Sequence, residues 1–174
     1  KLAKECGIEK PDTRLIDNQY FGVKRFDRDS KGNRYHTASA AGLLCADYRI
    51  PSIDYLHLMA LCRKLTNSEM DLWKLFRVAA FNYTIGNRDD HAKNFSFIVI
   101  DSSWHFAPAY DLLPSYGMNG YHTTSYNNSI TPTDNDVIAI AEKSGLDRKK
   151  AKVILDETKE KFFRFASTLH RGQK

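Results

Sequence analysis

The chain has 174 residues, enough for one domain with its own hydrophobic core. Its hydrophobic content of 42% and charged content of 27% are typical of a globular protein. No apolar run is long enough to span a bilayer and no leader-like stretch opens the chain, so the sequence predicts a cytoplasmic protein. Because the chain opens on Lys1, we expect it to be a piece of a longer polypeptide.

The three cysteines, Cys6, Cys45 and Cys62, are widely spaced and form no C-x-x-C pattern, which argues against a disulfide framework or a zinc site. We expect all three to be buried as small apolar residues.

The net charge of +5 arises from residue 142 onward, where ten Lys and Arg accompany five Asp and Glu. This basic end could contact nucleic acid or an acidic partner. We favour a solvated helix face, because no aromatic interleaving or known binding motif accompanies the charges.

The first part of the chain predicts a helix end followed by a hairpin. Residues 1–6 fit the tail of a helix that the next glycine stops. Thr13–Ile16 and Tyr20–Phe26 are apolar-rich and typical of strands, with a turn between them. The polar run 27–33 follows, and there we expect the chain to pass from one lobe to another.

The middle of the chain predicts helices. Residues 38–48 fit a short apolar helix, and residues 52–65 fit a second one with Ser52 as its N-cap. Residues 70–85 carry apolar side chains every three or four positions and form the longest predicted helix, which Gly86 can end.

The last part predicts a hairpin, a loop and two helices. Residues 95–100 and 104–106 fit two short strands, and residues 115–130 have the composition of a long irregular loop. That loop could border a substrate site or be a surface excursion. Helices are predicted from about residue 134 and over 147–170.

A polar octet follows the longest predicted helix: Asn87-Arg88-Asp89-Asp90-His91-Ala92-Lys93-Asn94. Asn94 comes five residues after Asp89, the spacing that a phosphotransferase loop uses between its base and its second metal ligand. Asp111 lies beyond the predicted hairpin and adds one more carboxylate. Such a set could activate a hydroxyl and hold Mg²⁺, although the spacing alone also fits a polar turn.

The octet with its continuation Phe95-Ser96, and the later segment Ala107-Pro108-Ala109-Tyr110-Asp111-Leu112-Leu113-Pro114-Ser115, resemble the two signature segments of the HipA-like serine/threonine kinases. These kinases are the toxins of bacterial toxin–antitoxin pairs. A third segment, residues 21–28, resembles the strand-to-hinge segment that holds the adenine in that family. The resemblance runs from Lys1 to about Ile140.

The resemblance implies an α+β fold: a protein-kinase-like, mainly helical large lobe over residues 28–174, with the last small-lobe strands and the hinge in residues 1–27. It implies ATP and Mg²⁺ as cofactors, Asp89 as the catalytic base, and Asn94 and Asp111 as magnesium ligands. The expected ATP-binding residues lie in the hinge, the catalytic loop and the second segment: Lys24, Arg25, Phe26, His91, Lys93, Asn94, Tyr110 and Asp111. From the residues alone, Phe26 could instead fill a strand core, and His91 and Lys93 could be structural or solvated.

Two positions depart from the family. Asp90 stands where the family often has glycine, and none of the nine glycines forms the G-x-G-x-x-G pattern of a phosphate loop. In the family that loop and a phosphate-binding lysine lie upstream of the segment that matches here.

The function that the resemblance implies is a serine/threonine protein kinase of a toxin–antitoxin system. Its substrate would be glutamate-tRNA ligase or another tRNA synthetase. Its partner would be a helix-turn-helix antitoxin, through which alone it would meet DNA, and no membrane is expected. The alternative is a non-catalytic kinase-like module that binds and regulates a partner, and direct nucleic-acid binding by the basic end ranks third.

Overall fold

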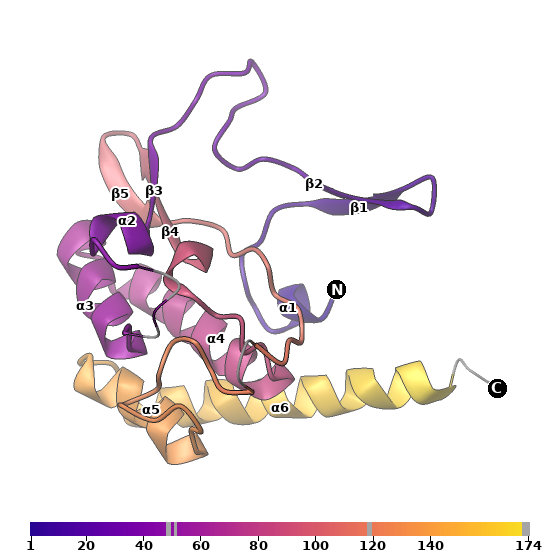
Figure 1. The fold of residues 1–174 in the computed structure, drawn as a ribbon, viewed down its shortest axis with the longest axis vertical. Helices are drawn as coiled ribbons and strands as arrows, with labels where there is room; N and C mark the ends of the chain where they lie inside the picture. The colour runs from indigo at the N-terminus through magenta and orange to yellow at the C-terminus, as the bar shows by residue number, and fades with distance from the viewer. Residues whose placement is uncertain (48–49, 51, 118–119, 172–174) are drawn as a thin grey trace.

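The computed structural model describes residues 1–47, 50, 52–117 and 120–171 (Figure 1). In chain order the elements are α1 (Leu2–Glu5), β1 (Thr13–Ile16), β2 (Tyr20–Val23), β3 (Thr37–Ser39), α2 (Ala40–Leu43), α3 (Tyr55–Thr66), α4 (Glu69–Ile85), a 3-10 turn η1 (Ala92–Asn94), β4 (Ser96–Ile100), β5 (Ser103–Phe106), α5 (Asp134–Lys143) and α6 (Arg148–Arg171). The fold is α+β, with a helical body and two small sheets, as the sequence predicts.

Helix α4 lies at the centre of the helical body. It contacts α3, α5, α6 and strand β5, and its buried side chains face several directions, among them Leu72, Trp73 and Leu75. A helix that is apolar on most sides is stable only when other elements surround it. The predicted helix is therefore confirmed, but the longest helix is α6 with 24 residues, not α4 with 17.

The β1–β2 hairpin stands away from the helical body (Figure 1). Its strands pair antiparallel from Thr13 opposite Val23 to Ile16 opposite Tyr20. Strand β2 ends at Val23, so the predicted extension to Phe26 is wrong. The last bond of the ladder runs from the Lys24 N–H to the Asp12 carbonyl, and the partner chain continues there with Pro11, a residue that is confined to the ends and edges of strands.

The second sheet has the order β3-β4-β5 and packs against the helical body. Strands β4 and β5 form the predicted hairpin, whereas β3 was not predicted. Strand β3 pairs Thr37 with Ile98 and Ser39 with Ser96. Three residues are too few to show a strand period, and only the pairing with β4 makes them extended.

Helix α2 is shorter than predicted. Ser39 caps it by accepting a hydrogen bond from the Gly42 N–H, and it ends at Leu43. Cys45 then adopts a left-handed conformation with φ of 50°, which breaks the helix. The end of the predicted helix, Tyr48, lies outside the described residues.

Helix α3 begins at Tyr55, with Asp54 as its N-cap, so the prediction of Ser52 as the cap is wrong. The Asp54 carboxylate accepts from the Leu56 N–H, and His57 completes a capping box. The other Asp54 oxygen binds the Ser125 hydroxyl and the Asn128 N–H. Long-range partners therefore decide which of the two candidate residues caps the helix.

Helix α1 packs against α6 and contributes Leu2 and Ala3 to the main core, together with Cys6 and Ile8. The expected boundary at residue 27 places α1 with the small lobe, and that division stays a prediction. Among the described residues, no helix is both long enough and apolar enough to cross a membrane.

The cysteines are the first test of this packing. Cys6 and Cys62 are buried as expected, but Cys45 is exposed, so the expectation of three buried cysteines is wrong. Burial raises the pKa of the Cys62 thiol to about 12 and also raises the pKa of Cys6. Since the thiolate is the reactive form, a maleimide reagent at mildly alkaline pH should modify Cys45 first. Mass spectrometry of the native protein should find the other two thiols modified only after unfolding, and early modification of Cys62 would contradict the fold.

The end of α4 provides the second test. Gly86 adopts φ of 69°, and a Cβ there would meet no atom within 4 Å, so backbone strain alone should penalise alanine. We expect Gly86→Ala to lower the free energy of unfolding by about 1–2 kcal/mol. Gly42→Ala is the matched control, because Gly42 is helical and its new Cβ would make only an ordinary contact at 3.7 Å. Urea unfolding should find that control equal to the native protein or up to about 1 kcal/mol more stable.

Candidate active site

The polar octet begins where α4 stops. Gly86 turns the chain out of the helix, and the buried Asn87 then fixes its direction. The Asn87 side-chain amide donates to the Asn82 side chain at 3.1 Å and to the Asp111 carbonyl at 3.1 Å. Sequence reasoning gave Asn87 no role, although its place between the helix end and Asp89 was a signal. Asn87 ties the octet to the second signature segment.

Asn94 joins the other two residues expected to carry the chemistry. Its side-chain Nδ2 donates to the Asp89 carbonyl at 2.9 Å and to the Asp111 Oδ2 at 3.3 Å. The η1 turn brings Asn94 back toward Asp89, and the β4–β5 hairpin returns the chain to Asp111. Three residues from separate positions in the sequence thus meet at one place.

Asp111 has φ of 56°, an uncommon conformation for a residue other than glycine. The side chains of Asp111 and Asp89 both reach solvent, and that of Asp89 is 49% exposed. The Nε2 of His91 lies 3.9 Å from the Asp89 Oδ1, a contact that becomes an ion pair when the imidazole is protonated. The site is open on this side and can receive a ligand.

Tyr110 holds the loop against strand β4. Its hydroxyl donates to the Lys93 carbonyl at 2.7 Å and lies 2.6 Å from the Ser96 hydroxyl. Burial raises the pKa of Tyr110, which keeps the hydroxyl protonated as a donor. The Tyr110 ring also stacks on Phe26 at a centroid distance of 5.8 Å. Phe26 therefore contacts the second signature segment and does not fill a strand core.

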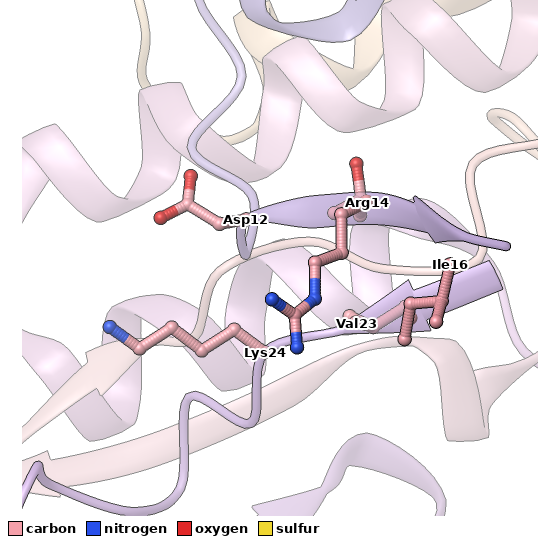
Figure 2. Close-up of a pocket in the computed structure, with 7 residues that line it drawn as sticks. Asp12, Arg14, Ile16, Val23 and Lys24 are labelled. Carbon is pink, nitrogen blue, oxygen red and sulfur yellow. The ribbon is translucent and has the colours of Figure 1, made fainter.

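Lys24 and Arg25 lie further out, beside two hollows at the base of the hairpin. One hollow of about 500 Å³ is lined by residues of both strands and by Lys24, and the Arg14 side chain crosses it from β1 toward β2 (Figure 2). The second, of about 290 Å³, is lined by Lys24, Arg25 and Phe26 among others. Asp89, Asn94 and Asp111 line neither hollow.

The segment after Asp111 is more ordered than its composition predicts. Thr124 and Tyr126 are fully buried and His122 is almost so. The Tyr126 hydroxyl donates to the Ala79 carbonyl of α4 at 3.0 Å. The described part of the segment has no helix or strand, as expected of an irregular loop, but residues 122–126 are packed into the protein and are not a surface excursion.

Asp90 is also fully buried, and its carboxylate binds this segment. Its partners include the Tyr55 hydroxyl and the His122 Nδ1. Asp90 therefore belongs to the support of the loop and does not face the open site.

Magnesium fits the donor chemistry of Asn94 and Asp111. The Asn94 amide uses its nitrogen toward Asp89 and Asp111, which leaves its carbonyl oxygen for a cation. An amide oxygen and a carboxylate suit Mg²⁺, which completes its shell with waters and phosphate oxygens. Among the described residues, no group of three or more His, Cys, Asp or Glu side chains is placed to hold a metal ion.

The cations of the basic end are partly paired along α6. Five of its cations pair with acids: Arg148, Lys152, Lys159, Lys161 and Arg164. This pattern is typical of a solvated helix face.

A central buried helix, a catalytic-type loop, a hairpin and a following acidic residue define the large lobe of a protein-kinase-like fold. The family model of the HipA-like C-terminal domain matches residues 1–164. The chain therefore belongs to the HipA-like C-terminal domain family.

Individual relatives agree with this assignment. "Putative kinase Y4dM" of Sinorhizobium fredii is 25% identical over 197 residues, which cover 99% of this chain and 47% of that protein. "Putative kinase Y4mE" of the same organism is 49% identical over 43 residues, 25% of this chain and 10% of that protein. The fold is similar to HipA of Shewanella oneidensis MR-1, solved with HipB and operator DNA, with a TM-score of 0.75, 19% identity, and coverage of 90% of this chain and 44% of that one. The chain thus spans less than half the length of these relatives.

Removing the Asp111 charge tests the metal site. We expect Asp111→Asn, in the full-length natural protein, to weaken Mn²⁺ binding in the presence of nucleotide by at least about tenfold, since even outer-shell changes cost that much. Asparagine tolerates the positive φ, so the fold should persist. Asp101→Asn is the matched control, because Asp101 is an exposed turn residue with φ of 49°. Electron paramagnetic resonance of bound Mn²⁺ gives the affinity, and equal affinities in the two variants would rule out Asp111 as a ligand.

Proposed function

We propose that this chain is the catalytic part of an ATP- and Mg²⁺-dependent serine/threonine protein kinase of a toxin–antitoxin system. The observation that carries the proposal is the position of Asn94, whose amide contacts both the Asp89 carbonyl and the Asp111 carboxylate. A base and two metal-binding oxygens are the set that phosphoryl transfer requires.

In this proposal the Asp89 carboxylate accepts the proton of a target hydroxyl and orients its oxygen toward the γ-phosphate. Asn94 and Asp111 hold Mg²⁺, which neutralises charge on the phosphates when it is bound. His91 and Lys93 lie on the same loop and would contact the phosphates.

The hinge residues would hold the other end of the nucleotide. The hollow lined by Lys24, Arg25 and Phe26 supports a role in adenine binding, and the Phe26–Tyr110 stack connects it to the catalytic loop. Tyr110 would act through this stack and through its bond to the Lys93 carbonyl. The N–H of Lys24 is already bonded to Asp12, so its carbonyl or its side chain would make the contact.

The substrate in this proposal is a serine of a protein, with tRNA synthetases as the first candidates. The partner is an antitoxin, because the S. oneidensis relative was solved with HipB and operator DNA. The substrate and the partner are proposed for the full-length protein. In the family, the phosphate loop lies upstream of the segment that matches this chain.

Asp89→Asn tests the mechanism. We expect the full-length variant to transfer phosphate from ATP about 100- to 10,000-fold more slowly, because it loses a general base. Nucleotide affinity and thermal unfolding should stay near the native values, since the Asp89 side chain is half-exposed and is not part of the core.

Asp156→Asn is the control for this experiment. Its side chain is 55% exposed, close to the 49% of Asp89, but it lies on α6 and pairs with Lys152. Transfer of labelled phosphate to tRNA synthetases gives the rate. Equal rates in both variants would refute Asp89 as the base, and absence of transfer and of nucleotide binding in the native protein would favour the non-catalytic module.

A further inference from the structure

Asp90 follows the proposed base directly, yet its side chain enters the core. The residue is completely buried, and four donors surround its carboxylate. Oδ1 accepts from the N–H groups of Thr123 and Thr124 at 3.0 and 3.2 Å. Oδ2 lies 3.1 Å from the Tyr55 hydroxyl and 3.0 Å from the His122 Nδ1. Carboxylate oxygens accept hydrogen bonds, and the tautomer of His122 that carries its proton on Nδ1 completes this set of donors.

The same segment also binds the backbone on both sides of Asp89. The Arg88 carbonyl accepts from the Thr123 N–H at 3.1 Å and from the Thr123 hydroxyl at 3.0 Å. The Thr124 hydroxyl donates to the Asp90 carbonyl. Residues 122–124 therefore hold the residue before the base and the residue after it.

The supporting segment is itself fixed to the helical body. The Tyr55 N–H donates to the Ser125 carbonyl, and the Ser125 N–H donates to the Ile53 carbonyl. Asp54 adds bonds to the Ser125 hydroxyl and to the Asn128 N–H. Because the loop around Asp89 is hydrogen-bonded to this fixed segment, the segment restricts the motion of the loop.

We propose that Asp90 and His122 form a buried positioning pair that sets the orientation of Asp89. The proposal rests on the proposed function for its effect on catalysis. Neither residue touches the reacting atoms. They hold the Asp90 side chain inside the core. The Asp89 carboxylate, on the preceding residue, then points to the open site in one orientation.

His122 allows a test that separates hydrogen bonding from packing. Its ring makes an edge contact with Tyr126 at 4.9 Å, and its Nδ1 contacts Asp90. His122→Phe keeps a ring and removes the donor, whereas His122→Asn removes the ring and keeps a donor close to the position of Nδ1. A positioning role through Asp90 predicts that asparagine rescues and phenylalanine does not. A packing role predicts the reverse order.

Two measurements should be made on the full-length natural protein. The first is hydrogen–deuterium exchange of the peptide covering residues 87–95, which reports the order of the loop whatever the activity. We expect faster exchange in His122→Phe and near-native exchange in His122→Asn. The second is steady-state phosphate transfer, where His122→Phe should lower kcat on the order of 100-fold with little change in the KM for ATP.

Asp90→Asn supplies the second variant, since its amide cannot accept from all four donors. It should raise exchange over residues 87–95 and lower kcat by a similar factor. Asp71→Asn is the matched control: Asp71 is also fully buried, but its carboxylate contacts Lys74 and His105, and neither belongs to the loop or to its supporting segment. That control should leave loop exchange at the native level.

Each outcome decides the proposal. Native loop exchange in Asp90→Asn, or equal behaviour of the two His122 variants, would overturn the positioning pair. A native protein that transfers no phosphate would refute the proposed function instead, and the exchange measurement would still show whether the pair orders the loop.

Discussion

The geometry of the site depends on the burial of helix α4 and on the place where that helix ends. Helices α3, α5 and α6 and strand β5 surround α4, so its position is fixed by close packing on several sides. Gly86 ends the helix in a conformation that other residues adopt at a cost, and Asn87 then binds both α4 and the Asp111 carbonyl. A rigid element thus delivers the octet at one defined point and in one direction.

The two adjacent aspartates then serve opposite sides of the chain. Asp89 faces solvent, where a substrate can reach it, while Asp90 faces the core, where hydrogen-bond donors surround it. Removing a charge from water costs free energy unless partners replace the lost hydration. The hydrogen-bonding groups around Asp90 replace it, and this explains how a carboxylate can be buried directly beside the loop. The exposed aspartate remains available for chemistry because its neighbour carries the structural contacts.

The sequence predicted those features that depend on neighbours along the chain. Apolar spacing identified α4 and α6, turn residues identified both hairpins, and the resemblance of the octet to a family segment pointed to the loop. The features that it missed depend on distant partners. Strand β3 exists through its pairing with β4, Asp54 caps α3 with help from Ser125, and Asp90 meets His122 across 32 positions. No local pattern contains such contacts, so the role of Asp90 could be found only in the folded chain.

The hairpin at the other end of the molecule has a different consequence. Its sheet consists of β1 and β2 alone, so each strand keeps one edge without a pairing partner in the described structure. Phe21 is 70% exposed, Tyr20 63% and Leu15 60%, so exposed apolar side chains lie beside those open edges. Two-stranded ribbons are marginally stable in water, and such edges accept further strands readily. A concentrated solution of the isolated chain should therefore tend to self-associate through this ribbon, and charged residues on its outward face should improve solubility without touching the catalytic loop.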